Sequence, residues 1–283
     1  NSIRVYEGMD WGEGGRAVRL MATDPGYSQS GMYLDDPAEL YFQYTRFYAL
    51  GPRFVPQARS VLMLGGGGYS VPKWILAGKS ALAAPDEVRM TVVEIDPAMT
   101  ATARRWFDLK DDARLTVQHE DARAFLNRQQ GQYDLVFVDV FNSHYAVPFQ
   151  MGTVEAARAL RRAVAPGGAL LMNVISAVNG EDGRLFQGIY GALSSAFAEV
   201  QVYCVSRPDR LGEVQNLMVV AFPEKRADTA GEKARAEEAG ANAGAGMAAM
   251  LATRLEGPLV FDTPPLTDDF APVERYALML LRQ

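Results

Sequence analysis

The spacing of hydrophobic residues changes near residue 50. Before that point, short apolar stretches partly alternate with polar residues and are separated by Gly, Asp and Pro, a pattern typical of small antiparallel sheets. The stretch "PAELYFQYTRFYAL" then places Leu40, Tyr44 and Phe47 at helical spacing. We therefore predict that residues 1–50 form an N-terminal β annex followed by a helix.

From Arg59 onward, apolar runs and helical patterns alternate regularly. The runs that predict strands are "SVLMLG", "VRMTVVEI", "RLTVQHE", "YDLVFVDV", "GALLMNVIS", "VQVYCV" and "NLMVVAF". Helical patterns separate the first six runs, and the early runs are apolar almost throughout. Strand–helix units of this kind favour a mostly parallel sheet with helices on both faces. We predict such an α/β domain over residues 51–223.

The C-terminal part has a different composition. Residues 224–247 are rich in Ala, Gly and charged residues, which predicts a low-complexity linker. Residues 248–283 have an apolar start, a proline- and acid-containing middle and an apolar end. We predict that they form a C-terminal helix and a tail that packs on the α/β domain.

Charge and composition narrow the possible partners. The formal net charge of −6 disfavours nucleic acid and anionic membrane surfaces, since both require basic patches. No apolar run reaches the roughly 18 residues of a membrane span. No residues have metal-ligand spacing, so we expect no metal. We expect a cytoplasmic protein without direct membrane contact; alternatively, because the chain begins at Asn1, it is a domain of a longer membrane protein.

Consecutive glycines follow the first strand of the α/β domain. Gly65, Gly66 and Gly67 leave the backbone bare, so a ligand can approach closely. The third glycine of a dinucleotide fingerprint is replaced by Ser70, and no Lys-Ser/Thr pair closes the turn as in an NTPase. These absences favour a phosphate-free S-adenosyl cofactor. A turn that serves packing alone is the alternative.

Acidic residues end the next two strands. Glu94, in "VVEIDP", is well placed to accept hydrogen bonds from ribose hydroxyls, or it is a solvated strand-end carboxylate. Asp121, in "EDARAFL", would accept from the adenine amine, cap the following helix, or do both. Together with the glycine turn, these residues predict an adenosine site.

Asp139 ends the fourth strand. Because ligands of open α/β sheets bind at the carboxyl ends of the strands, its carboxylate could orient or deprotonate a nucleophile. The alternative is an acid that caps the following loop. We predict that Asp139 is the catalytic residue.

These motifs, with "QS" at Gln29–Ser30, "APGGALLMNV" and "LTDDFAPVE", resemble the spermidine synthase family, in particular its divergent spermidine synthase-like members. The resemblance implies a Rossmann-like fold of the S-adenosylmethionine-dependent methyltransferase type and a homodimer. It implies transfer of an aminopropyl-type group from S-adenosylmethionine or its decarboxylated form to an amine or another nucleophile. It adds Gln29 and Ala122 to the cofactor site. On the acceptor side it implies Tyr44 and the position of Asn142. Tyr145 lies on a predicted loop that could cover the site, where it would line the acceptor site or be incidental. Asp268 and Asp269 would either fold back over the acceptor or cap the final helix.

This chain departs from the family pattern at three positions. Gly68 replaces the acid of "GGGDG", Asn142 replaces the second acid of "DxxD", and Arg46 replaces the acid of "YHE". A polyamine is a multiple cation that carboxylates would have to bind. The departures therefore disfavour putrescine as the acceptor, and they favour a carboxylate on the cofactor or the acceptor.

Other functions fit the same residues. A methyltransferase would share the adenosine site and release S-adenosylhomocysteine. A lyase or cyclase would attack the cofactor's own side chain without an acceptor. A non-catalytic nucleoside-binding domain of a membrane protein would keep the site without needing Asp139.

Overall fold

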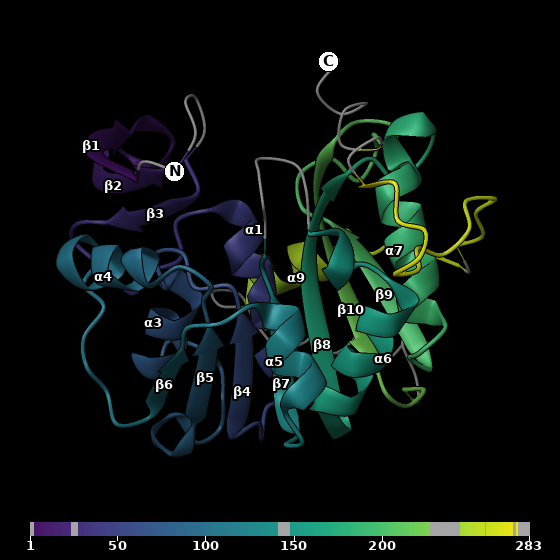
Figure 1. Cartoon of the computed structure of the whole chain (residues 1–283). Coiled ribbons are helices and arrows are strands. Elements are labelled where there is room, and N and C mark those ends of the chain that lie inside the picture. Colours follow the sequence, from purple (N-terminus) through teal and green to yellow (C-terminus); the bar gives the residue numbers. More distant parts are fainter. Residues whose placement is uncertain are drawn as a thin grey trace.

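The computed structural model describes residues 3–23, 28–140, 148–226, 244–257, 259–273 and 276. The N-terminal annex is an antiparallel sheet of β1 Arg4–Asp10, β2 Arg16–Ala22 and β3 Ser30–Tyr33. Figure 1 shows it beside α3 and α4, apart from α6 and α7. The predicted annex is confirmed.

The segment after the annex is helical but broken. It consists of α1 Gln43–Arg46, a 3₁₀ turn over Phe47–Ala49 and α2 Leu50–Phe54. The helical region therefore extends beyond residue 50. Pro52 fits because it lies in the first turn of α2, where its missing N–H is tolerated.

A seven-stranded sheet forms the centre of the molecule, in the order β6-β5-β4-β7-β8-β10-β9. All neighbours from β6 to β8 pair in parallel, and β10 pairs antiparallel with both β8 and β9. This arrangement confirms the predicted mostly parallel sheet. Its strands are β4 Ser60–Leu64, β5 Arg89–Val93, β6 Leu115–Gln118, β7 Tyr133–Val138, β8 Val164–Ser176, β9 Glu199–Cys204 and β10 Gln215–Phe222.

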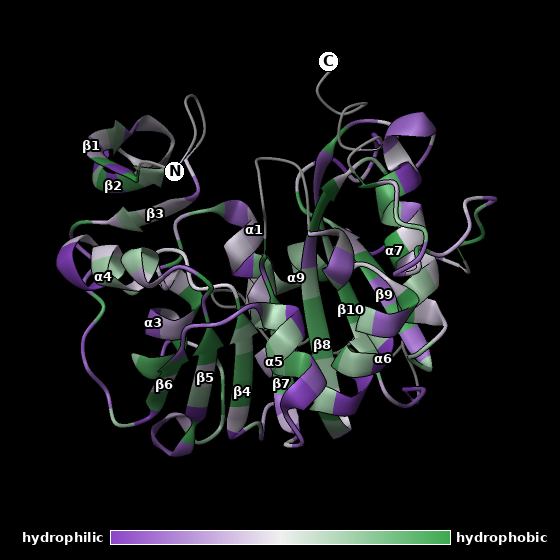
Figure 2. Cartoon of the chain, in the orientation of Figure 1, coloured by the Kyte–Doolittle hydropathy of each residue, from purple (hydrophilic) through white to green (hydrophobic). Residues whose placement is uncertain are grey.

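Helices cover both faces of this sheet, as Figure 1 shows. They connect the strands in sequence as α3 Ser70–Leu76, α4 Pro97–Trp106, α5 Ala122–Arg128, α6 Val154–Ala163 and α7 Arg184–Ser194. Successive side chains of a strand point to opposite faces, so each strand contributes to two cores. In β4, Leu62 and Leu64 face one core, whereas Val61 and Met63 face the other. Figure 2 shows largely hydrophobic strands at the centre, and helices that carry both hydrophilic and hydrophobic residues.

The C-terminal segments pack against the edge and one face of the sheet. Helix α9, Gly244–Ala252, is followed by residues that bond to the edge strand β9, with the Leu255 N–H donating to the Val202 carbonyl at 2.8 Å. Leu266 is buried in the core that includes α6 and α7. Most of the predicted linker, 227–243, lies outside the described residues. In the part of the chain that is described, no helix has the length and apolarity needed to span a membrane.

Candidate active site

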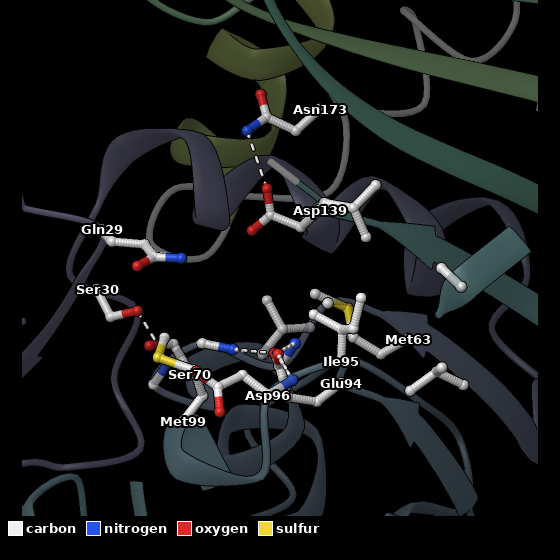
Figure 3. Close-up of a pocket in the computed structure, with 18 of the residues that line it drawn as sticks. Gln29, Ser30, Met63, Ser70, Glu94, Ile95, Asp96, Met99, Asp139 and Asn173 are labelled. Carbon is white, nitrogen blue, oxygen red and sulfur yellow. Dashed lines mark hydrogen bonds between the residues drawn. The ribbon is translucent and has the colours of Figure 1, made fainter. Parts of the chain in front are cut away.

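A cavity of about 420 Å³ opens at the carboxyl ends of the central strands. Its walls come from the glycine turn after β4, from the ends of β5 and β7, and from β3 and α1. Figure 3 shows Glu94 and Asp96 on one side of it, Asp139 and Asn173 on the opposite side, and Gln29 and Ser30 at its flank. The cavity lies at the sheet edge where ligands of open α/β folds bind.

The glycine turn passes close to other parts of the backbone. Gly65 has φ +93°, and a Cβ there would lie 2.1 Å from the Asp139 carbonyl oxygen. At Gly66, a Cβ would meet the Tyr69 ring at 2.8 Å. Larger residues would therefore fill or distort the turn, which leaves bare backbone facing the cavity.

Glu94 holds this turn in place. Its carboxylate accepts hydrogen bonds from the N–H groups of Gly66 at 2.8 Å and Gly67 at 3.2 Å through one oxygen. The other oxygen accepts from the Asp96 N–H at 2.9 Å. Glu94 is 7% exposed and lines the cavity. The strand-end acid is thus tied to the glycine turn rather than simply solvated.

The annex contributes to the same wall. The Gly68 N–H donates to the Ser30 hydroxyl at 2.8 Å, and a Cβ on Gly68 would meet the Ser30 Cβ at 2.8 Å. Ser30 therefore occupies the space beside the turn into which a larger residue at position 68 would extend. Gln29 lines the cavity next to it and accepts a hydrogen bond from the Thr23 hydroxyl at 3.2 Å.

Asp121 caps helix α5 and also lines the cavity. One of its carboxylate oxygens accepts from the Ala124 N–H at 2.9 Å, which satisfies a free amide of the first turn. Its neighbour Ala122 lines the cavity as well. The capping interpretation is confirmed, and Asp121 caps the helix at the wall of the cavity.

Asp139 is held by side chains on both of its oxygens. The Tyr44 hydroxyl donates to Oδ2 at 3.2 Å, and the Asn173 amide donates to Oδ1 at 3.1 Å. Burial raises the pKa of Asp139 to about 6, although both hydrogen bonds act in the opposite direction. Burial and the nearby Asp139 carboxylate also raise the pKa of Tyr44 well above its usual value. Asp139 is therefore a stronger base than an ordinary carboxylate, and Tyr44 stays a neutral donor.

The charge of the cavity has one sign. The described residues that line it include five acids and no Lys, Arg or His; the acids are Glu94, Asp96, Glu120, Asp121 and Asp139. Such a lining favours a cationic ligand, since burying a charge requires a partner of opposite charge.

Arg46 does not add positive charge to this cavity, which corrects the expectation that it accommodates a carboxylate. Its guanidinium donates to the Leu40 carbonyl at 3.0 Å and to the Tyr33 hydroxyl at 3.4 Å. Arg46 is not among the residues that line the cavity. Its position follows from helix geometry, because residues two apart in α1, such as Tyr44 and Arg46, point in different directions.

The structure also corrects the predicted acceptor-side position of Asp268 and Asp269. The Asp268 carboxylate accepts from Arg123 at 2.8 Å and from the Thr153 hydroxyl at 2.6 Å. Neither aspartate lines the cavity, because these partners hold the tail against α5 and the start of α6. The predicted residues Asn142 and Tyr145 lie outside the described residues.

Polar residues that sequence reasoning missed complete the walls. Asn173 and Asn216 line the cavity; Asn173 interrupts the apolar run "LLMNVIS", and Asn216 begins the run "NLMVVAF". An amide in a buried strand needs a partner, so these two positions carried a signal. Ser30 stood beside Gln29 in the sequence, but its contact with Gly68 depends on how the annex docks.

The sheet topology defines a Rossmann-like fold of the S-adenosylmethionine-dependent methyltransferase type. Residues 44–226 match the Spermine/spermidine synthase domain family. Because this match covers more than half of the chain, the chain belongs to that family. The family consists of polyamine aminopropyltransferases, which use decarboxylated S-adenosylmethionine as a co-substrate.

Individual proteins are similar to this chain in sequence or in fold. A polyamine aminopropyltransferase of Vibrio vulnificus is 32% identical over 179 residues, which are 62% of this chain and 56% of that protein. The chain thus aligns with just over half of that relative's length. A probable spermidine synthase from Corynebacterium glutamicum has a TM-score of 0.68 at 22% identity and covers 82% of this chain and 81% of its own. Human methyltransferase-like protein 13, in complex with SAH, has a TM-score of 0.54 at 18% identity, covering 78% and 95% of the two chains. Both structures show the fold alone.

Proposed function

We propose that this chain is a transferase that moves an aminopropyl-type group from decarboxylated S-adenosylmethionine to an amine acceptor. The observation that carries the proposal is the partly buried Asp139 carboxylate, held by Tyr44 and Asn173 in the same cavity as the glycine turn and Glu94. Gly65, Gly66, Gly67, Glu94, Asp121, Ala122 and Gln29 would hold the nucleoside. Tyr44 and Asp139 would face the amine.

The reaction requires little beyond positioning and a base. The amine nitrogen attacks the carbon beside the sulfonium, the new N–C bond forms, and the C–S bond breaks. The sulfur keeps the electron pair and leaves as part of methylthioadenosine. The nitrogen then loses a proton, which Asp139 accepts, because a carboxylate with a pKa of about 6 is ionised at neutral pH and still basic enough to help.

The acidic lining favours the decarboxylated cofactor over intact S-adenosylmethionine. The decarboxylated form carries two positive charges and no carboxylate, whereas the intact form would bring an anion into a cavity whose described charges are all negative. We expect the decarboxylated form to bind at least about tenfold more tightly, a difference of about 1.4 kcal/mol. Titration calorimetry with both nucleosides measures this directly, and equal affinity would contradict the expected preference.

Product analysis tests the function itself. The protein is incubated with each nucleoside, with and without a mixture of mono-, di- and polyamines, and the nucleoside product is identified by mass. Methylthioadenosine formed only from the decarboxylated form with an amine would support the proposal. S-adenosylhomocysteine would indicate a methyltransferase. Methylthioadenosine from intact S-adenosylmethionine without acceptor would indicate a lyase, and tight binding without turnover would indicate a binding domain.

A further inference from the structure

Two asparagines interrupt apolar strands beside the cavity. Asn173 lies toward the carboxyl end of β8 and is 2% exposed, and Asn216 lies near the start of β10. Burying an amide costs free energy unless its polar atoms find hydrogen-bond partners. The partners of these two side chains therefore indicate what the asparagines do.

The strand register places both asparagines on the same sheet face as Asp139. In the antiparallel pair β8 and β10, Asn173 lies opposite Met218 and Asn216 lies opposite Ile175, so the asparagines are diagonal neighbours. In the parallel pair β7 and β8, Val138 lies opposite Met172. Continuing that register by one residue brings Asp139 beside Asn173.

Hydrogen bonds join the three side chains in one direction. The Asn216 amide nitrogen donates to Asn173 Oδ1 at 3.0 Å, and the Asn173 amide nitrogen donates to Asp139 Oδ1 at 3.1 Å. A reversed Asn173 amide would turn its oxygen toward the carboxylate and its nitrogen toward the nitrogen of Asn216. Donation from Asn216 therefore selects the orientation in which Asn173 donates to Asp139.

We propose that Asn216 is a positioning residue of this site. Through Asn173, it keeps the carboxylate of Asp139 facing the cavity and favours its ionised form. Tyr44 binds the other oxygen, so the carboxylate is held from two sides and cannot rotate without losing a bond. The kinetic consequence rests on the proposed function. The hydrogen-bond relay itself is a property of the protein without substrate.

The charge state of Asp139 gives a test that needs no turnover. Among the described residues, the phenols of Tyr44 and Tyr48 interact electrostatically with Asp139, and their pKa values are raised well above the usual value, so they remain neutral from pH 4 to pH 9. Carbon-13 NMR of labelled aspartate follows the Asp139 carboxyl, which Asp139→Asn identifies by its disappearance. In Asn216→Leu, we expect the Asp139 pKa to move up from about 6, because Asn173 is then free to reverse.

Gln201→Leu is the matched control. Gln201 is a 4% exposed amide in β9 of the same sheet, it accepts from the Tyr203 hydroxyl at 2.6 Å, and it does not line the cavity. This variant loses a buried amide and its hydrogen bonds, whereas Asn216→Leu loses a half-buried amide, so the control reports at least the effect of lost stability. The Asp139 pKa should not change in it. An unchanged Asp139 pKa in Asn216→Leu would overturn the proposal.

Kinetics separate the relay from direct substrate binding. In Asn216→Leu, kcat for the amine transfer should fall about tenfold, and in the Asp139→Asn background the same substitution should change kcat by less than about twofold, because both act on one group. An equal fall in both backgrounds would mean that Asn216 contacts the substrate instead, against the proposal. If the wild-type protein forms no transfer product but the pKa shift occurs, the proposed function fails and the relay stands.

Discussion

The two halves of the cavity are held together by different kinds of hydrogen bond. In the nucleoside half, defined by Gly65–Gly68, Glu94 and Asp121, the bonds run between backbone amides and side-chain oxygens. In the Asp139 half, defined by Asp139, Tyr44, Asn173 and Asn216, they run between side chains. Groups bound to backbone amides depend on the path of the main chain at the turn and at the start of the helix. The side-chain network depends instead on which side chains the two strands, the end of β7 and helix α1 carry.

This difference sets what each half tolerates. The nucleoside half should fail through changes of backbone shape, with loss of folding or binding. Side-chain substitutions in the Asp139 half should leave the protein folded. They should lower kcat and change the pH dependence of the reaction. Substitutions in the two halves can therefore test whether the nucleoside half depends on backbone shape and the Asp139 half on its side chains.

The largest effect is expected from Gly65→Ala. The positive φ of +93° disfavours any side chain, and the new Cβ would lie 2.1 Å from the Asp139 carbonyl oxygen. We expect a loss of about 3 kcal/mol or more in the free energy of unfolding, from strain and overpacking together. Urea unfolding measures the stability, and calorimetry should show no nucleoside binding.

Gly212→Ala is the control for that substitution. A Cβ at Gly212 would meet nothing within 4 Å. It should change the unfolding free energy by less than about 0.5 kcal/mol, as surface substitutions usually do. If Gly65→Ala behaved in the same way, the nucleoside half would not depend on backbone shape.

Asp139→Asn should separate rate from stability. As the proposed general base, Asp139 should contribute a factor of about 10² to 10⁴ to kcat, and Asn cannot accept the proton.

The pH dependence of stability follows from the pKa of Asp139. The folded pKa of about 6 lies above the ordinary value of 3.8, so the contribution of Asp139 to stability is full below pH 3.8 and is lost as the pH rises through 6. At pH 7 the ionised carboxylate is therefore a cost, and Asn should leave the unfolding free energy unchanged or raise it by up to about 2 kcal/mol. Urea unfolding at pH 7 and pH 4 should show that this gain disappears in acid; a large loss of stability at pH 7 would argue that Asp139 serves structure.

Tyr44→Phe should have a smaller effect with a specific signature. The Tyr44 hydroxyl donates to Asp139 and lowers its pKa, so its removal should move the acidic limb of the kcat/KM–pH profile upward from about 6. The fall in kcat should be about tenfold, typical of one lost hydrogen bond to a charged group. Tyr48→Phe removes a phenol that donates to the Val138 carbonyl at 2.8 Å and should leave the limb in place. Equal shifts in both variants would point to a general packing effect.

The difference between the two halves of the cavity also explains how much of the fold and of the site could be predicted from the sequence. The strands, the glycine turn, Glu94, Asp121 and Asp139 follow from apolar runs that end in chemically distinct residues, because the ends of parallel strands meet at one edge. Asn173 and Asn216 could not be placed in the same way. Neither ends a run, and which amides meet depends on strand register.

Contacts between segments that are distant in the chain could also not be predicted from the sequence. An acid in the tail, such as Asp268, can face a ligand, a helix end or an arginine, and only the docking of the tail decides among them. Here the partner is Arg123, with an exposed side-chain fraction of 14%, and the Thr153 hydroxyl. Arg46 likewise carried the right charge for a carboxylate site, but the orientation of α1 directs it to Leu40 and Tyr33.

The smallest kinetic effect is expected from Asp268→Asn, which lies outside both halves. Its ion pair with Arg123 at 2.8 Å is partly solvated on the aspartate side, with 43% of that side chain exposed, so its loss should lower the unfolding free energy by about 1 kcal/mol. The values of kcat and KM for the amine should change by less than about twofold, because the carboxylate lies outside the cavity lining. Asp269→Asn, an exposed neighbour, is the matched control and should change neither stability nor kinetics. A rise in KM for cationic acceptors in Asp268→Asn, without one in Asp269→Asn, would place the tail on the acceptor side after all, and the Asp139 half would then extend to a third, C-terminal segment.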